Sequence, residues 1–234
     1  MISITRRLFG ATTAVGAAST LAGCMGSGLP GLGGLFGDGE DRSGPVADYA
    51  TLYGANTGEP FPVQAFRYES VPAQFLRRDV AYEGPEDPGT IVVDPAAHYL
   101  YLVGRRKRAT RYGVGVGREG FGWRGIAQIN MRRSWPDWVP PREMVERDPD
   151  VRAQLVSTSR GPGVPGGPRS PLGARAMYLF AKGVGDTGYR IHGTTEPETI
   201  GTSVSSGCIR MVNQDIIHLY GRAPDGTNVV VLAG

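Results

Sequence analysis

Apolar runs rich in β-branched and aromatic residues, separated by Gly, Pro and charged positions, recur from about residue 90 onward. Such runs, bounded by turn residues, are typical of β-strands. The sequence DPAA at residues 94–97 lies between two of these runs and predicts a hairpin. Strands are predicted at residues 90–94, 98–103, 109–117, 127–131, 174–181, 189–192 and 227–232. The chain is therefore expected to be mainly β.

Two stretches depart from this pattern and predict short helices. Residues 135–160 are punctuated by prolines, and a short helix interrupted at Pro149 is expected in the second half of this stretch. The Gly/Pro-rich residues 161–171 follow, and so long an insertion in a compact domain is expected to be a lid or a binding loop. Near the C-terminus, a helix is predicted at residues 213–220, with Asn213 as its N-cap and a glycine ending it.

The composition fits one globular domain with many loops. Apolar residues make up 40% of the 234 positions and charged residues 20%, while 36 Gly and 18 Pro favour a β architecture over a helical bundle. The folded part is expected to start near Tyr49. Residues 47–87 are predicted to be an extension of short elements, with a helical turn at 72–78, and residues 88–234 the main domain.

Residues 1–23 have the pattern of an export signal. Paired arginines at positions 6 and 7 precede an uncharged stretch that is too short for a membrane span of about 20 residues but suits a signal peptide. The arginine pair resembles the twin-arginine signal. The LAGC sequence at residues 21–24 resembles a bacterial lipobox, which implies cleavage before Cys24 and lipid attachment to its sulfur. The alternative is an ordinary signal peptide followed by an incidental cysteine.

Export of this kind predicts a periplasmic protein held by lipid at the outer or the inner membrane. Residues 24–46 are Gly-rich with acidic positions and are predicted to be a flexible tether, averaging roughly 25 Å between its ends. Met25 stands where an aspartate often retains lipoproteins at the inner membrane, which favours the outer membrane.

Charge gives little indication of a polymeric partner. The formal net charge is +3, a weak positive bias. The basic run at residues 105–108 has no interleaved aromatic residues and is predicted to be a solvated hairpin tip. A nucleic-acid partner is therefore not expected.

The chain contains only two cysteines and three histidines, which narrows the search for a nucleophile and a base. His192 lies in YRIHGT, and Cys208 lies in SSGCIRM. A thiol nucleophile needs a base, and imidazole has the pKa that suits this task near neutral pH. With Cys24 lipidated, the chain would hold no second thiol with which Cys208 could form a disulfide in an oxidising compartment, which marks Cys208 as reactive. The alternative is an inert core cysteine, but the flanking Ser and Gly residues would make a poor core strand.

A strand that ends at His192 and a segment that holds Cys208 before a helix are expected to bring the two side chains together at one end of a sheet. Gly193 and Gly207 flank them without side chains, and the backbone N–H groups around Gly207 are candidate oxyanion donors. The second imidazole nitrogen needs an acceptor that fixes the tautomer. No acidic residue is obviously placed for this, so the carbonyl of Gly193 is the candidate.

Residues 191–194 (IHGT) together with residues 205–213 (SSGCIRMVN) resemble the L,D-transpeptidase catalytic domain of the YkuD type. Similar segments are GTIVV at 89–93, PLG at 171–173 and GTNVV at 226–230, so the resemblance covers about residues 88–232. It implies a mainly β, sandwich-like domain with short helices. It also implies a cysteine acyltransferase that acts on peptidoglycan stem peptides without a cofactor.

The resemblance gives Cys208 as the nucleophile and His192 as the base. The thiolate attacks the carbonyl of the third stem residue, usually meso-diaminopimelate, in a tetrapeptide donor. The terminal D-alanine leaves, and an amine acceptor resolves the thioester, either on another stem in a 3→3 crosslink or on an envelope protein. Many members carry a second histidine where this chain has Ser206, and this serine either donates a hydrogen bond instead or has no role.

Further residues are weaker candidates. Arg210 is expected either to hold a carboxylate of the stem peptide, which a guanidinium suits, or to brace the catalytic loop. Ser205 is expected to orient the Cys208 loop through hydrogen bonds. His98 and His218 are expected to be structural, and two cysteines, one of them lipidated, leave no zinc site. Three tryptophans line the donor groove or pack in the core or lid: Trp123, Trp135 and Trp138.

Competing functions remain open at this point. Water could resolve the same thioester, which would give a carboxypeptidase or an amidase. A non-catalytic lipoprotein that binds peptidoglycan on this fold is a rival of another class, although the presence of both Cys208 and His192 argues against it. A papain-type peptidase is disfavoured because such enzymes place the cysteine before the histidine.

Overall fold

The computed structural model describes residues 48–117, 123–205 and 207–233, without the side chains of Val204 and Ser205. The expected export signal, the lipidation site Cys24, the tether and Ser206 therefore lie outside the described residues. None of the helices in the described ranges is long and apolar enough to cross a membrane.

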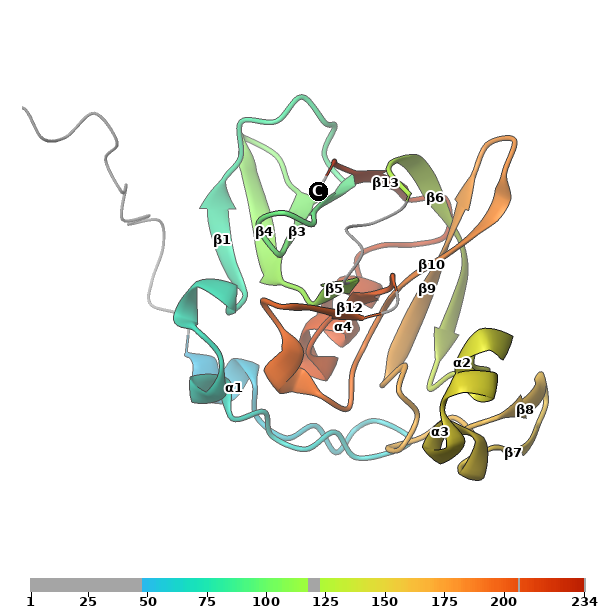
Figure 1. The fold of residues 1–234 in the computed structure, drawn as a ribbon. Coiled ribbons are helices and arrows are strands. Elements are labelled where there is room, and N and C mark those ends of the chain that lie inside the picture. Colours follow the sequence, from blue (N-terminus) through green and yellow to red (C-terminus); the bar gives the residue numbers. More distant parts are fainter. Residues whose placement is uncertain (1–47, 118–122, 206, 234) are drawn as a thin grey trace, which may run out of the picture. The chain divides into compact units, whose positions relative to one another are not determined.

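The described residues form a nine-stranded sheet of mixed direction, shown in Figure 1, and two small two-stranded sheets. In spatial order the large sheet contains β1 (Arg78–Ala81), β4 (Arg108–Gly113), β3 (Tyr99–Val103), β2 (Ile91–Asp94), β13 (Asn228–Val231), β6 (Gly125–Ser134), β9 (Arg175–Ala181), β10 (Gly185–His192) and β12 (Ile209–Arg210). The small sheets pair β5 (Val116–Gly117) with β11 (Ser203–Ser205), and β7 (Val156–Thr158) with β8 (Gly161–Gly163). The expectation of a mainly β fold is confirmed.

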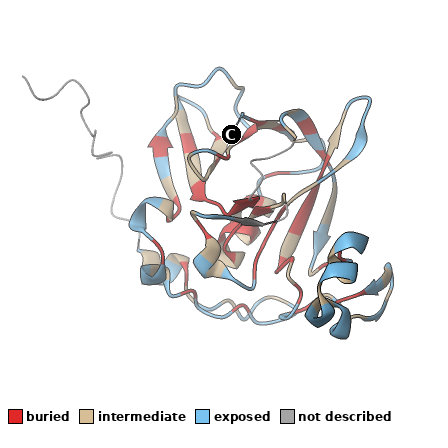
Figure 2. Ribbon diagram, in the orientation of Figure 1, coloured by how far each residue is buried: buried red, intermediate tan, exposed pale blue. Residues whose placement is uncertain are grey.

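Helices are short and few in the described ranges. The α-helices are α1 (Tyr49–Leu52), α2 (Arg142–Arg147), α3 (Pro149–Ala153) and α4 (Asn213–Tyr220). The 3₁₀ turns are η1 (Tyr68–Ser70), η2 (Ala73–Phe75) and η3 (Pro197–Thr199). Figure 2 shows that α2 and α3 are largely exposed, whereas buried residues lie on the inner strands and on α4.

The large sheet has two limbs on either side of β13, one formed by β1, β4, β3 and β2 and the other by β6, β9, β10 and β12. The core lies between these limbs, with α4 against it. Leu100 and Tyr112 on one limb, and Met177 and Leu179 on the other, belong to one apolar cluster that also contains Ile216 of α4. All five are fully buried. Because burying one such side chain contributes about 1.5–3 kcal/mol, this cluster is the main source of stability for the elements that carry His192 and Cys208.

The extension before residue 88 is part of the same folded unit. Its strand β1 pairs antiparallel with β4. A second apolar cluster joins Tyr53, Phe66 and Leu76 of the extension to Val212, which directly precedes α4. The extension therefore packs against the segment that follows the candidate nucleophile.

A buried polar network also ties the extension to α4. Asp215 is 1% exposed, and its Oδ1 forms an ion pair with Nη1 of Arg77 at 3.4 Å. The Tyr53 hydroxyl donates to Oδ2 of Asp215 at 3.1 Å and accepts from the backbone N–H of Arg77 at 2.7 Å. Burial raises the pKa of Asp215 to about 6, against the opposing effects of Arg77 and Tyr53.

The prediction of the third strand was wrong, because the predicted strand was too long. Residues 109–117 were expected to be one strand, but β4 ends at Gly113 and β5 is a separate strand that pairs with β11. Between them, Gly115 exchanges two backbone hydrogen bonds with Arg210, at 3.0 and 2.8 Å. A Cβ at Gly115 would lie 2.9 Å from the carbonyl oxygen of Thr199, so this close approach requires glycine.

The insertion between β6 and β9 has secondary structure of its own. The interruption expected at Pro149 is confirmed, because Pro149 starts α3 and Asp148 caps that helix by accepting from the N–H groups of Asp150 and Val151. The stretch from residue 161, expected to be a loop, begins with strand β8 of the β7–β8 hairpin. Trp138 and Val164 form a bridge that connects the insertion's two ends.

Candidate active site

The strands β10 and β12 position the two candidate catalytic residues. They pair in parallel, with Ile191 beside Ile209 and His192 beside Arg210. Continuing this register by one residue places Cys208 beside Arg190. Since strands lie about 4.8 Å apart and rise about 3.3 Å per residue, the Cα atoms of His192 and Cys208 are diagonal neighbours about 8 Å apart.

Both residues lie on the same face of the sheet. Ile191 and Ile209 are fully buried and belong to the core cluster on one face. Because side chains alternate along a strand, His192, Arg190, Cys208 and Arg210 share the opposite face. The register gives the two residues a common face, and the contact between their side chains that the sequence predicts stays a prediction.

The imidazole of His192 is buried, with 4% of the residue exposed. Its Nδ1 lies 2.5 Å from the carbonyl oxygen of Gly193, the acceptor expected from the sequence. This contact favours the tautomer with the proton on Nδ1, which leaves the lone pair of Nε2 free to accept a proton. Burial, together with the smaller effects of the Arg210 and Arg190 charges, lowers the pKa of His192 to about 4 against the opposing effect of the Gly193 carbonyl. The imidazole is therefore neutral at neutral pH and competent as a base.

The Cys208 side chain is partly exposed. Burial raises the pKa of its thiol above the ordinary value, although the charge of Arg190, a hydrogen bond from the Arg190 backbone and the charge of Arg210 act in the other direction. Because the pKa of the thiol is raised and the pKa of the imidazole is lowered, both groups are neutral in the resting protein.

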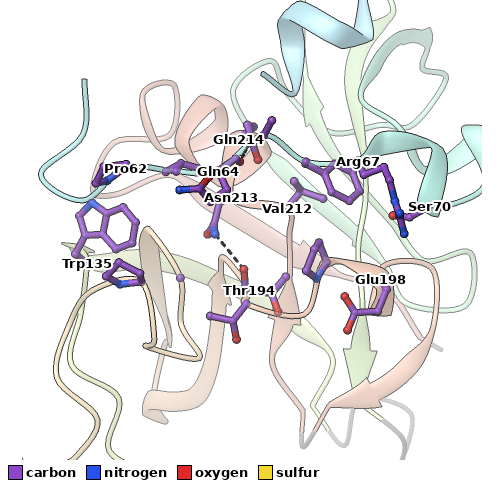
Figure 3. A pocket seen from close by; sticks show the side chains of 17 residues that line it. Pro62, Gln64, Arg67, Ser70, Trp135, Thr194, Glu198, Val212, Asn213 and Gln214 are labelled. Atoms are coloured by element: carbon purple, nitrogen blue, oxygen red, sulfur yellow. Dashed lines mark hydrogen bonds between the residues drawn. The ribbon is translucent and has the colours of Figure 1, made fainter. Parts of the chain in front are cut away.

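Asn213 holds the segment after His192 in place. Its Nδ2 donates to the carbonyl of Thr194 at 3.0 Å, as Figure 3 shows, and its Oδ1 accepts from the N–H of Ala174 at 2.9 Å. A Cβ at Gly193 would lie 2.2 Å from this Oδ1, and one at Gly173 would lie 2.3 Å from it. The two glycines therefore make room for the amide that joins the two loops.

The expectation that Asn213 caps α4 was wrong. The N-cap of α4 is Val212, which makes no side-chain capping hydrogen bond, and Asn213 is the first residue of the helix. Its amide bonds two distant loops instead of the first turn of its own helix. Asn213 also lines a pocket of about 530 Å³ with Thr194 and residues 62–67 of the extension, but neither His192 nor Cys208 lines this pocket (Figure 3).

Residues 88–231 match the family model YkuD, the L,D-transpeptidase catalytic domain. The chain belongs to this family. Among curated relatives, the probable L,D-transpeptidase ErfK/SrfK of Salmonella typhimurium is 29% identical over 211 residues, covering 82% of this chain and 61% of the relative. The putative L,D-transpeptidase YqjB of Bacillus subtilis is 47% identical over 66 residues, covering 28% of this chain and 38% of the relative. The chain thus matches 61% and 38% of the lengths of these two relatives, less than two thirds in each case.

Solved structures match over part of the chain. An L,D-transpeptidase from Mycobacterium smegmatis is 17% identical, with a TM-score of 0.43, over 62% of this chain and 58% of that one. A Brucella melitensis protein described as a probable carnitine operon oxidoreductase is 47% identical, with a TM-score of 0.46, over 71% of this chain and 99% of that one. That description applies to the Brucella protein alone.

In this L,D-transpeptidase domain, Arg210 makes the contacts of a brace. Its Nη1 pairs with Oε2 of Glu196 at 2.7 Å, and its backbone forms the two-bond bridge to Gly115. Gly207 has φ of +121°, and a Cβ there would lie 3.3 Å from the ring of Tyr189, so the position next to Cys208 favours glycine. Ser206 and the Ser205 side chain lie outside the described residues.

The other aromatic and histidine candidates have structural contacts. Trp123 packs on Tyr189 at 6.0 Å between ring centroids, and Trp135 Nε1 donates to Glu59 at 3.1 Å. His98 Nε2 lies 2.9 Å from Ser203 Oγ, and His218 Nδ1 lies 2.8 Å from the Tyr112 hydroxyl. Within the described ranges, no group of three or more His, Cys, Asp or Glu residues is arranged to hold a metal ion.

Proposed function

We propose that this protein is a peptidoglycan L,D-transpeptidase that works through a thioester on Cys208. The observation that carries the proposal is the neutral His192, with its tautomer set by Gly193, on the same sheet face as Cys208. Family membership supports an enzyme of this type. The donor is a tetrapeptide stem whose third residue provides the acyl group.

The reaction runs in two half-reactions with balanced proton transfers. As the sulfur of Cys208 attacks the carbonyl of the third residue, Nε2 of His192 takes the thiol proton. The C–N bond to the terminal D-alanine breaks, and the same proton passes to the leaving amine. An acceptor amine then gives its proton to His192 and attacks the thioester, and Cys208 leaves as the thiol after the proton returns. Backbone N–H groups around Gly207 are proposed to stabilise the oxyanion in both steps.

Mass spectrometry of the full chain with a disaccharide-tetrapeptide tests the proposal. The expected result is an acyl-enzyme that has lost D-alanine, together with 3→3 crosslinked dimers, and both are absent in Cys208→Ala. A Cys24→Ser variant is the matched control, because it removes the other thiol and should acylate like the wild type. Tripeptide without dimers would indicate hydrolysis, and the absence of both adduct and product would favour a binding lipoprotein.

A further inference from the structure

A row of side chains crosses the sheet beside the candidate nucleophile. Tyr178 of β9 pairs with Arg190 of β10, and the β10–β12 register places Arg190 beside Cys208. Paired residues share a face, so Tyr178 lies on the same face as the thiol. At about 4.8 Å per strand, Tyr178 is two strands, or about 10 Å, from Cys208.

Two arginines gather on the ring of Tyr178. The guanidinium carbon of Arg190 lies 4.4 Å from the ring centroid, and that of Arg160 lies 5.6 Å from it. Nη1 of Arg160 also donates to the Tyr178 hydroxyl at 2.9 Å. Tyr178 itself is 2% exposed, and both guanidinium groups lie against its ring.

The two arginines differ in how their charge is compensated. Arg190 is bound by Asp186 at both ends of its fork, with N–O distances of 2.7 and 2.8 Å. Arg160 is exposed and forms no ion pair with a carboxylate among the residues that the structure describes. The charge of Arg160 helps to lower the pKa of both Asp137 and Asp186, but no carboxylate of the described residues bonds its guanidinium, whose remaining N–H groups are open to an anionic ligand.

The position of Arg160 is set by its hairpin. It lies in the turn between β7 and β8, where its N–H donates to Thr158 Oγ1 at 3.2 Å and Thr158 Oγ1 donates to the Gly161 carbonyl at 2.6 Å. The neighbouring Ser159 donates to Asp137 Oδ2 at 2.8 Å. The insertion thus extends one guanidinium, already oriented by Tyr178, over the catalytic face.

We propose that Arg160, supported by Tyr178 and Arg190, binds the free carboxylate at the end of the side chain of the third stem residue. This inference rests on the proposed function and names a specificity residue for its donor site. With the acyl carbon at Cys208, a carboxylate a few bonds along the same residue falls along the row toward Tyr178. A guanidinium fork suits a carboxylate because it donates two parallel hydrogen bonds.

Two matched donors test the assignment, one with this side-chain carboxylate free and one with it amidated. The wild type is expected to prefer the free acid about tenfold in kcat/KM, mainly through KM, as for a charged hydrogen bond near solvent. Arg160→Gln should reduce that preference to about twofold or less, through a lower kcat/KM for the free acid. Arg160→Lys, which keeps the charge and loses the fork, should be intermediate.

Arg142→Gln is the control, because Arg142 lies on α2 of the same insertion and pairs with Glu146. It should keep the full preference for the free acid. Equal use of both donors by the wild type, or an undiminished preference in a folded Arg160→Gln, would overturn the inference and leave the thioester function standing. Failure of the wild type to acylate with either donor would overturn the proposed function and the inference together.

Discussion

At the scale of single residues, the site pairs a thiol with an imidazole whose pKa values are shifted in opposite directions. Burial raises the pKa of the thiol and lowers that of His192 to about 4. Each shift favours the neutral form of its group. In the proposed mechanism, the chemistry therefore relies on proton transfer during attack rather than on a preformed ion pair.

We predict that Cys208 is a thiol, not a thiolate, at neutral pH. The ultraviolet absorbance of the Cys208 thiolate is the difference between the Cys24→Ser protein and the same protein that also carries Cys208→Ser. Its titration with pH should have a midpoint above 9.0, the ordinary pKa of a thiol. The sign follows from the raised pKa, since the uncharged form persists to higher pH. A thiolate signal already present near pH 5 would show that the pair is ionised at rest.

Asn213 is expected to be a positioning residue for His192. Asn213→Ala removes both loop contacts and should lower kcat about 10- to 100-fold with little change in KM, because small displacements of a catalytic group have costs of this size. Asn213→Asp keeps the acceptor for Ala174 but loses the donor to Thr194, so its kcat should lie between those of the wild type and Asn213→Ala. Steady-state kinetics of the folded variants measure this.

Asn228→Ala is the control for this prediction, because Asn228 bonds Gln128 on the exposed surface of neighbouring strands. Its kcat should be unchanged. A parallel rise in KM for Asn213→Ala, with kcat intact, would mean that Asn213 shapes substrate binding rather than the placement of the base.

Local reasoning from the sequence found the acceptor of His192 but not the role of Asn213. The Gly193 carbonyl is adjacent in the chain to the imidazole, so the lack of a nearby acidic residue was enough to indicate it. The partners of Asn213 lie 39 and 19 residues away. A capping propensity describes only the next turn, so the distant contacts took the side chain instead.

At the scale of elements, predictions that depend on local backbone preferences are correct, whereas a prediction that ignored contacts between distant residues is wrong. The hairpin after Asp94 and the helix break at Pro149 follow from local backbone preferences and are confirmed. The split of the third strand depends on Gly115 bonding to Arg210, which is distant in sequence. No local sequence pattern indicates Arg160, because its proposed role depends on the strand register that positions Tyr178 next to it.

The extension should contribute measurably to the stability of the element that follows Cys208. Tyr53→Phe removes a hydroxyl that bonds both Asp215 and the Arg77 backbone, and leaves two buried groups short of a partner. We expect the free energy of unfolding to fall by about 1–3 kcal/mol in denaturant titrations.

Tyr49→Phe is the matched control, because Tyr49 packs in the same aromatic cluster and its hydroxyl bonds none of the described residues. Its unfolding free energy should change by less than about 0.5 kcal/mol. Equal stability of the Tyr53→Phe and wild-type proteins would mean that the buried network contributes no net stability, as some buried ion pairs do not.

At the scale of the whole molecule, the sequence predicts a domain that is attached to a membrane through Cys24. Cys24→Ala should move the protein from the membrane fraction to the soluble periplasmic fraction, because a lipid on the cysteine would be its anchor. Cell fractionation followed by immunoblotting measures this. Continued membrane association of the variant would contradict lipidation, and a cytoplasmic location of the wild type would contradict export.

The position of β13 in the sheet determines when the large sheet can be completed during synthesis. This strand is the last of those described to be synthesised, yet it pairs with β2 on one side and β6 on the other, at the middle of the sheet. The two limbs can join through it only after residues 228–231 have left the ribosome. Nascent chains that do not yet include β13 therefore lack the strand that joins β2 to β6.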